Sequence, residues 1–114
     1  MQALLEQKDV NSKELQSLLE ARELGKINFM LVDVREDMEF EMSHIRGADL
    51  LKPTSVFEEW ASDFFHEVED ETVIFTCRTG NRSGQVRSIF AKNGHKNVIN
   101  HYGGIVSYRG EINR

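Results

Sequence analysis

Cysteine is scarce in this sequence, because Cys77 is the only one among 114 residues. A single thiol cannot form a disulfide within the chain, and it cannot build a metal site out of several thiolates. Two roles are left for Cys77, a small buried hydrophobic side chain or a reactive thiol. The residues around it have to distinguish between them.

Long apolar runs, low-complexity stretches and basic clusters are also missing. No apolar segment approaches the roughly 18 residues that cross a bilayer, and proline occurs once. The net charge is −5, and the 14 lysines and arginines are scattered, so no nucleic-acid-binding surface is indicated. We predict a single domain over residues 1–114, located in the cytoplasm, with neither nucleic-acid nor membrane partners.

The first elements expected from the N-terminus are a short strand near Val10 and then a helix. Asn11 is followed by Glu14 three residues later, which predicts a capping box at the start of that helix. Leu15 and Leu18 then fall on one apolar face of the helix.

Two continuous apolar runs, residues 29–34 and 72–76, are typical of strands that are covered on both faces. The other predicted elements are helices over 36–43, over 55–65 and from Arg82 or Ser83 to Asn93, and strands over 48–51 and 97–100. The predicted core-facing positions of the two longer helices are Val56, Phe57, Trp60, Phe64 and Phe65, followed by Val86, Ile89 and Phe90. The tail after Gly104 is expected to add no more than one or two helical turns. This alternation predicts an α/β fold with a parallel sheet, helices on both faces, and ligands beyond the carboxyl ends of the strands.

The loop that follows the 72–76 strand is the most informative part of the sequence. It comprises Cys77, Arg78, Thr79, Gly80, Asn81, Arg82 and Ser83. A short loop between a strand and a helix N-terminus can point several backbone N–H groups inward, and the helix dipole adds positive potential. We expect Arg78 and Arg82 to add cationic charge and to lower the pKa of Cys77 below the value of about 8.5 for free cysteine. These neighbours favour a reactive thiol over a structural one.

Several short motifs occur in a fixed order along the chain. They are Leu31-Val32-Asp33-Val34-Arg35-Glu36, Glu39-Phe40, His44-Ile45-Arg46-Gly47-Ala48, Cys77 to Ser83, and Tyr102-Gly103-Gly104-Ile105. Their order and spacing, over about Val10 to Gly110, resemble the rhodanese homology domain. The resemblance implies a three-layer α/β/α domain with a mainly five-stranded parallel sheet. It also implies a catalytic cysteine that opens a loop after the fourth strand.

The resemblance assigns roles to residues by their position in these motifs. Cys77 is the expected nucleophile, and the expected substrate-binding residues are Arg78, Thr79, Gly80, Asn81, Arg82 and Ser83. Asp33 and Arg35 are expected to support the loop through a structural network, and His44 is expected to be a structural histidine. Tyr108 stands where many relatives carry tryptophan, and it is expected to keep an aromatic wall there.

The activity implied by the resemblance is sulfur transfer through a persulfide on Cys77. The donors would be thiosulfate, a polysulfide or another persulfide, and the acceptors would be cyanide or a thiol, including a thiol on a partner protein. No metal or organic cofactor is expected to take part.

Two alternatives to sulfur transfer stay open at this point. Phosphatases and arsenate reductases of the same fold family have five residues between the cysteine and an arginine. Here four residues separate Cys77 from Arg82, and Ser83 occupies the next position. The tighter ring suits the terminal sulfur of a persulfide better than a tetrahedral phosphoryl group. The second alternative is a module that binds a partner or relays sulfur without turnover of its own.

Overall fold

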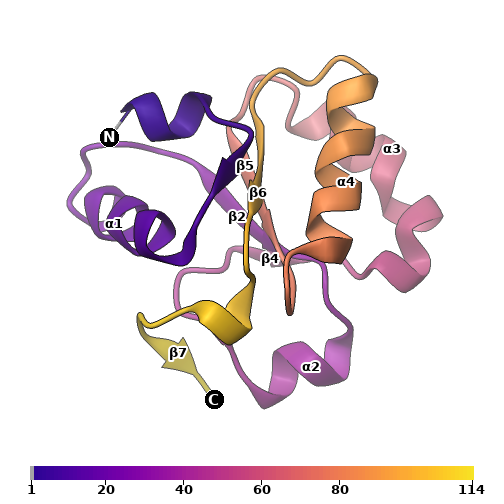
Figure 1. Cartoon of the computed structure of the whole chain (residues 1–114). Helices are drawn as coiled ribbons and strands as arrows, with labels where there is room; N and C mark the ends of the chain where they lie inside the picture. The colour runs from indigo at the N-terminus through magenta and orange to yellow at the C-terminus, as the bar shows by residue number, and fades with distance from the viewer. Residues whose placement is uncertain (1) are drawn as a thin grey trace.

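The computed structural model describes residues 2–114, which form a central sheet with helices on both faces (Figure 1). The α-helices are α1 (Ser12–Glu23), α2 (Asp37–Met42), α3 (Phe57–Glu67) and α4 (Asn81–Lys92). The strands are β1 (Asp9–Val10), β2 (Met30–Asp33), β3 (His44–Ile45), β4 (Leu50–Leu51), β5 (Val73–Thr76), β6 (Val98–His101) and β7 (Ile112–Asn113). Three short 3₁₀ helices are η1 (Gln2–Glu6), η2 (Thr54–Val56) and η3 (Ile105–Ser107).

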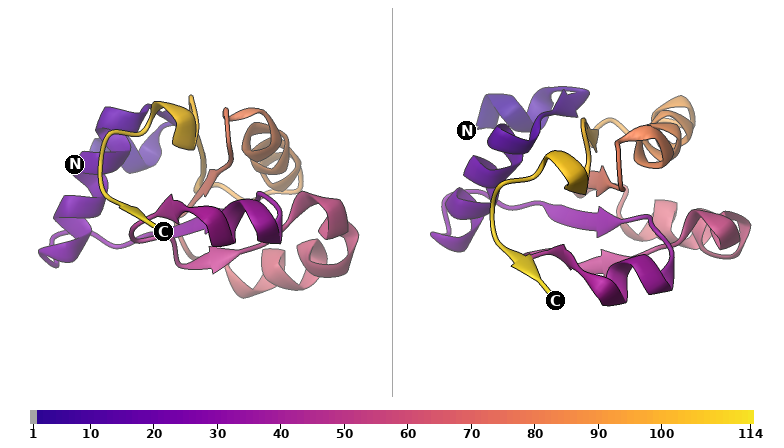
Figure 2. Two further views of the ribbon diagram at one scale, coloured as in Figure 1. Left: turned by 90° about the horizontal axis from the view of Figure 1, so that it is seen from below. Right: turned by 60° about the horizontal axis from the view of Figure 1, so that its bottom comes forward.

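The main sheet has five strands in the order β1-β6-β5-β2-β4, and every neighbouring pair is parallel. Helix α1 covers one face, and α3 and α4 cover the other (Figures 1 and 2). The predicted three-layer α/β/α class with a five-stranded parallel sheet is confirmed. Parallel strands end at the same edge, so the Cys77 loop after β5 and helix α2 after β2 lie at one end of the sheet (Figure 1).

Side chains at successive strand positions point to opposite faces of the sheet and so contribute to two separate hydrophobic cores. Leu31, Ile74 and Ile99 pack with α1, whereas Val32 and Phe75 pack with α3 and α4. These strand residues are at most 1% exposed, because helices cover the sheet from both sides. Because both faces of these strands are buried, nearly every position is apolar, which explains the continuous apolar runs in the sequence.

The start of α1 has the predicted geometry. The amide of Glu14 donates to Asn11 Oδ1 at 2.8 Å, and the amide of Asn11 donates to Glu14 Oε1 at 2.9 Å. This reciprocal pair satisfies two backbone N–H groups that the helix leaves free.

Two predicted core positions are exposed instead. Val56 is 37% exposed and lies in η2 before α3, and Ile89 is 43% exposed on the outer side of α4. Helix α3 begins at Phe57 rather than Ser55, because Thr54–Val56 form the tighter 3₁₀ turn. Trp60, Phe64, Val86 and Phe90 are buried as predicted, and Phe57 and Phe65 are partly buried against the same core.

The C-terminal tail differs from the expectation of a helical turn or two alone. After η3 it forms β7, which pairs antiparallel with β3 through His44–Asn113 and Ile45–Ile112. A strand this short has no periodicity that a sequence could reveal, and its partner lies far away along the chain. Within residues 2–114, no helix is both long and apolar enough to cross a membrane.

Candidate active site

Cys77 follows the last residue of β5 directly, and its side chain is 1% exposed. Its Sγ accepts hydrogen bonds from the amide of Gly80 at 3.1 Å and from the amide of Ser83 at 3.4 Å. The Ser83 hydroxyl lies 3.3 Å from the same sulfur. The loop therefore curls around the sulfur and turns its donors inward, although the side chain also borders the hydrophobic core of α3 and α4.

The pKa of Cys77 lies below the ordinary value for a cysteine thiol. Burial alone would raise this pKa, but the Ser83 hydroxyl and the amides of Ser83, Gly80 and Thr79 outweigh burial by hydrogen bonding to the thiolate. The sequence predicted inward-facing loop amides together with the charges of Arg78 and Arg82, and the groups that lower this pKa are the loop amides and the Ser83 hydroxyl.

Glycine backbones allow the loop to close. Gly80 caps the N-terminus of α4 with φ of +99°, and a Cβ there would lie 3.0 Å from the amide nitrogen of Gly103. Gly104 has φ of +64°, and a Cβ there would overlap the carbonyl of Arg78. The amide of Ile105 donates to the carbonyl of Cys77 at 2.9 Å. The segment after β6 is thus packed directly onto the backbone of the loop.

Arg82 is paired with an acidic residue of α2. Its two terminal nitrogens donate to the two carboxylate oxygens of Glu39 at 2.8 and 3.0 Å. This hydrogen-bonded contact lowers the pKa of Glu39 from 4.5 to about 2. The pKa of Arg82 is raised, first by Glu39 and to a smaller extent by the charge of Cys77. The other two long side chains expected at the site, Arg78 and Asn81, are exposed.

Asp33 and Arg35 form a buried ion pair at 2.8 Å, with side chains 1% and 5% exposed. Arg35 also donates to the carbonyl of Ser43 at 2.7 Å and to that of Glu39 at 3.4 Å, so the pair is joined to the last turn of α2. No hydrogen bond joins either residue to Cys77 within the described chain. The structure connects the pair to the loop through the backbone of Glu39, whose carboxylate binds Arg82.

Two further predicted residues have structural surroundings. The Nδ1 atom of His44 lies 3.0 Å from the carbonyl of Phe40, and the two rings stack at 3.9 Å between centroids. Tyr108 is 8% exposed in the core beside α1 and meets the ring of His101 edge-on at 6.2 Å. Neither ring is among the hydrogen-bond partners of Cys77.

Strand β6 contributes two polar residues that the sequence did not single out. Asn100 accepts from the Ser83 hydroxyl at 2.6 Å and donates to the carbonyl of Gly80 at 3.2 Å. His101 lies between the hydroxyls of Thr76 and Ser12, at 2.7 and 2.8 Å. Burial lowers the pKa of His101 from 6.5 to about 4, so the ring is neutral at pH 7. The only sequence signal was two polar residues inside a strand that is otherwise apolar.

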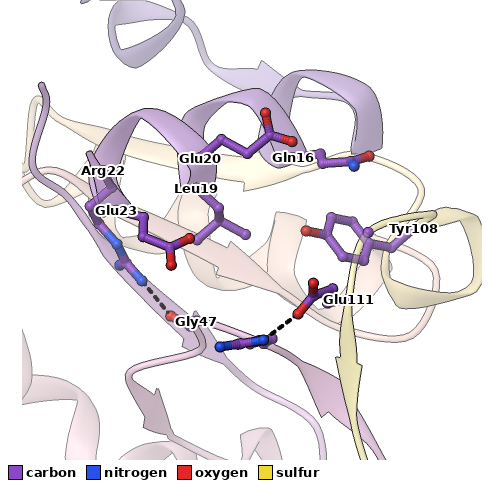
Figure 3. A pocket seen from close by; sticks show the side chains of 10 residues that line it. Gln16, Leu19, Glu20, Arg22, Glu23, Gly47, Tyr108 and Glu111 are labelled. Atoms are coloured by element: carbon purple, nitrogen blue, oxygen red, sulfur yellow. Dashed lines mark hydrogen bonds and ion pairs between the residues drawn. The ribbon is translucent and has the colours of Figure 1, made fainter. Parts of the chain in front are cut away.

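Two cavities lie away from the Cys77 loop. The larger, about 410 Å³, opens between α1, the turn after β3 and the C-terminal segment, and it is lined by residues such as Glu20, Arg46 and Tyr108 (Figure 3). The smaller, about 330 Å³, lies between α3 and α4. Neither is lined by a loop residue. Among residues 2–114, no group of three or more His, Cys, Asp or Glu side chains is placed to hold a metal ion.

The fold and the loop define a class of α/β domain with a thiol at the carboxyl end of a central parallel strand. Residues 12–111 match the family model of the rhodanese-like domain, and the chain belongs to that family. The Rhodanese-like/PpiC domain-containing protein 12, chloroplastic, of Arabidopsis thaliana is 33% identical over 102 residues, which cover 89% of this chain and 33% of that protein. The probable adenylyltransferase/sulfurtransferase MoeZ of Mycobacterium tuberculosis is 32% identical over 78 residues, 68% of this chain and 19% of that protein.

Another curated relative is a tRNA uridine(34) hydroxylase of Streptococcus thermophilus, 30% identical over 83 residues, which cover 69% of this chain and 25% of that protein. The chain thus spans a third or less of the length of these relatives. A crystal structure of a rhodanese-like domain protein from Staphylococcus aureus is 26% identical, with a TM-score of 0.69, and the match covers 92% of this chain and 94% of that one. A solution structure of a rhodanese-like domain from Anabaena has a TM-score of 0.76 at 19% identity, covering 94% and 79%, and shows likeness of fold alone.

Proposed function

We propose that this chain is a sulfurtransferase in which Cys77 carries a sulfane sulfur as a persulfide. The support comes from the donors around the sulfur, which are the amides of Gly80 and Ser83 and the Ser83 hydroxyl, at 3.1 to 3.4 Å. Together they lower the pKa of Cys77 although the side chain is buried. A thiolate at neutral pH is the nucleophile that sulfur transfer needs.

In the first half-reaction the Cys77 thiolate attacks the outer sulfur of thiosulfate. A new sulfur–sulfur bond forms to Cys77, the original bond to sulfite breaks, and sulfite leaves with the bonding electron pair. The negative charge then sits on the terminal sulfur of the Cys77 persulfide, where loop amides such as those of Thr79, Gly80 and Ser83 are proposed to hold it. A polysulfide or another persulfide would donate in the same way.

In the second half-reaction an acceptor nucleophile attacks the terminal sulfur. Cyanide, a small thiolate or a thiolate of a partner protein takes the sulfur, and the Cys77 thiolate is the leaving group. The donors that lower the pKa of Cys77 also make it a better leaving group. The chain has no second cysteine, so the acceptor has to be another molecule. We place this chemistry in the cytoplasm, where thiols stay reduced.

The pairing of Arg82 weighs against the phosphatase alternative. Phosphoryl transfer needs a guanidinium that grips the equatorial oxygens of the phosphoryl group. Both terminal nitrogens of Arg82 are instead bound to Glu39, at 2.8 and 3.0 Å. A persulfide has a single terminal atom and requires no such clamp.

Intact-mass spectrometry tests the proposal directly. Incubation with thiosulfate or a polysulfide is expected to add about 32 Da per sulfur to the wild-type chain. Cyanide or a small thiol should then remove the added mass. The Cys77→Ser variant is the matched control and is expected to gain none.

Three results would count against this function. A mass gain on Cys77→Ser would place the sulfur elsewhere. A wild-type chain that gains none would support the binding module, and turnover of an aryl phosphate at a rate like that of thiosulfate would support the phosphatase.

A further inference from the structure

The hydroxyl of Ser83 has two acceptors and one proton. Its oxygen lies 3.3 Å from Cys77 Sγ and 2.6 Å from Asn100 Oδ1. A serine hydroxyl donates one hydrogen bond at a time, so the proton serves either the sulfur or the amide. Cys77, Ser83 and Asn100 are 1%, 0% and 7% exposed, which makes the choice between the two acceptors energetically significant.

The orientation of Asn100 is set by a second contact. Its Nδ2 donates to the carbonyl of Gly80 at 3.2 Å, which turns Oδ1 toward Ser83. The flipped amide would place Oδ1 against that carbonyl and would face two acceptors toward each other. Gly84 leaves room for the amide, because a Cβ there would lie 3.2 Å from Nδ2.

The charge on the sulfur determines which of the two acceptors receives the hydrogen bond from the Ser83 hydroxyl. A thiolate is an anion in a buried site and gains most from the Ser83 proton. A neutral thiol, or the inner sulfur of a persulfide, carries no such charge and is a weak acceptor. In those states the shorter bond to Asn100 is preferred.

We propose that Asn100 is a positioning residue that withdraws the Ser83 hydroxyl from Cys77 when the sulfur is neutral and releases it when the thiolate forms. The hydroxyl rotates and no proton leaves Ser83, so every atom and charge of the two half-reactions stays balanced. Asn100 thereby destabilises the unloaded Cys77 thiolate relative to the persulfide-loaded chain. The effect on loading rests on the proposed sulfur transfer, whereas the effect on the unloaded thiol does not.

The charged and titratable groups around the Cys77 loop come from several elements. Arg78 lies in the loop, Arg82 in α4, Glu39 in α2 and His101 in β6. Substitutions at Asn100 and Ser83 leave these groups in place. A change in the pKa of Cys77 that depends on Ser83 therefore reports on the hydroxyl, whereas loss of the Asn100 contact to Gly80 would act with or without Ser83.

A double-mutant cycle measures this competition. The probe is the rate of alkylation of the unloaded chain by iodoacetamide as a function of pH, with thiolate absorbance as a second measurement. Ser83→Ala should raise the pKa of Cys77, whereas Asn100→Leu should lower it by about 0.5 to 1, because the hydroxyl loses its competing acceptor. In the Ser83→Ala background, Asn100→Leu should have no further effect.

A purely structural role for Asn100 predicts the opposite pattern. Loss of loop support would raise the pKa of Cys77, and it would do so with or without Ser83, which would overturn the proposal. Asn100→Ala adds no bulk beside Gly84 and serves as the second variant if the leucine side chain prevents folding. Asn97→Leu makes the same replacement at an exposed position just before β6 and should leave the pKa unchanged.

The loaded fraction links the inference to sulfur transfer. Mass spectrometry at fixed thiosulfate and sulfite should show Asn100→Leu shifted about threefold or more toward the free thiolate. An unchanged ratio would overturn the loading part of the proposal. If the wild type takes up no sulfur at all, the proposed function fails, while the pKa cycle still decides the role of Asn100.

Discussion

At the scale of single residues, the site depends on polar side chains that are placed by contacts between segments far apart in the sequence. Ser83 was expected in the substrate loop, but its partner Asn100 lies in β6, 17 residues further along the chain. Glu39 belongs to a motif, yet only the folded chain brings its carboxylate to Arg82. Loop residues could be predicted because they are consecutive, whereas their partners come from other elements.

His101 makes stability depend on pH. The folded chain keeps the ring neutral, with the pKa lowered by burial from 6.5 to about 4, whereas the unfolded chain takes up a proton near 6.5. This contribution to stability is therefore complete above pH 6.5 and is lost as the pH falls toward 4, by on the order of 3 kcal/mol.

Urea unfolding over that pH range measures the effect. The His101→Gln variant should show a correspondingly weaker loss of stability on acidification. His66→Gln, which changes an exposed histidine of α3, is the control and should follow the wild type. Equal acid sensitivity of His101→Gln and the wild type would contradict the neutral ring.

At the scale of elements, the segment between β6 and η3 holds the Cys77 loop in place. Gly104→Ala would strain a backbone with φ of +64° and push a methyl group into the carbonyl of Arg78. Displacement of the amides should slow loading of Cys77 by about 10- to 100-fold. The rate of persulfide formation, followed by intact mass, checks this expectation.

The matched control for that substitution is Gly94→Ala. Gly94 also has a positive φ, +102°, but a Cβ there would meet no atom within 4 Å. The variant should lose about 1 kcal/mol of stability and keep the loading rate. Equal loading rates in both alanine variants would show that the segment does not position the loop.

The elements divide into those that the sequence could predict and those that it could not. The capping box at Asn11 and the two buried strands depend on local patterns, and they lie where they were expected. Strand β7 depends on pairing with β3, more than 60 residues earlier. Ile89 fits the helical period but faces solvent. The period predicts which side of a helix faces the core, but not how much of that side the neighbouring elements bury.

At the scale of the whole molecule, stability depends on two cores that share one thin sheet. Phe90 is at the centre of the core beside α3 and α4, with the rings of Phe75 and Phe65 at 5.2 and 5.4 Å from its centroid. Phe90→Ala should cost about 3 to 5 kcal/mol of unfolding free energy, because it leaves a cavity in this core. Chemical denaturation at pH 7 measures the loss.

Ile89 offers a matched control on the same helix. It is 43% exposed, so Ile89→Ala should cost less than about 1 kcal/mol. Similar losses at positions 89 and 90 would contradict the placement of α4 on the sheet.

The solitary, enclosed thiol also has a consequence for redox damage. A sulfenic acid formed at Cys77 by peroxide has no companion cysteine in this chain with which to condense, so it cannot be captured as an internal disulfide. Its protection has to come from outside, through a small thiol able to enter the loop or through a sulfur already bound there. A chain stored empty in air should therefore drift irreversibly toward the sulfinic form, and a sulfur-loaded one should survive.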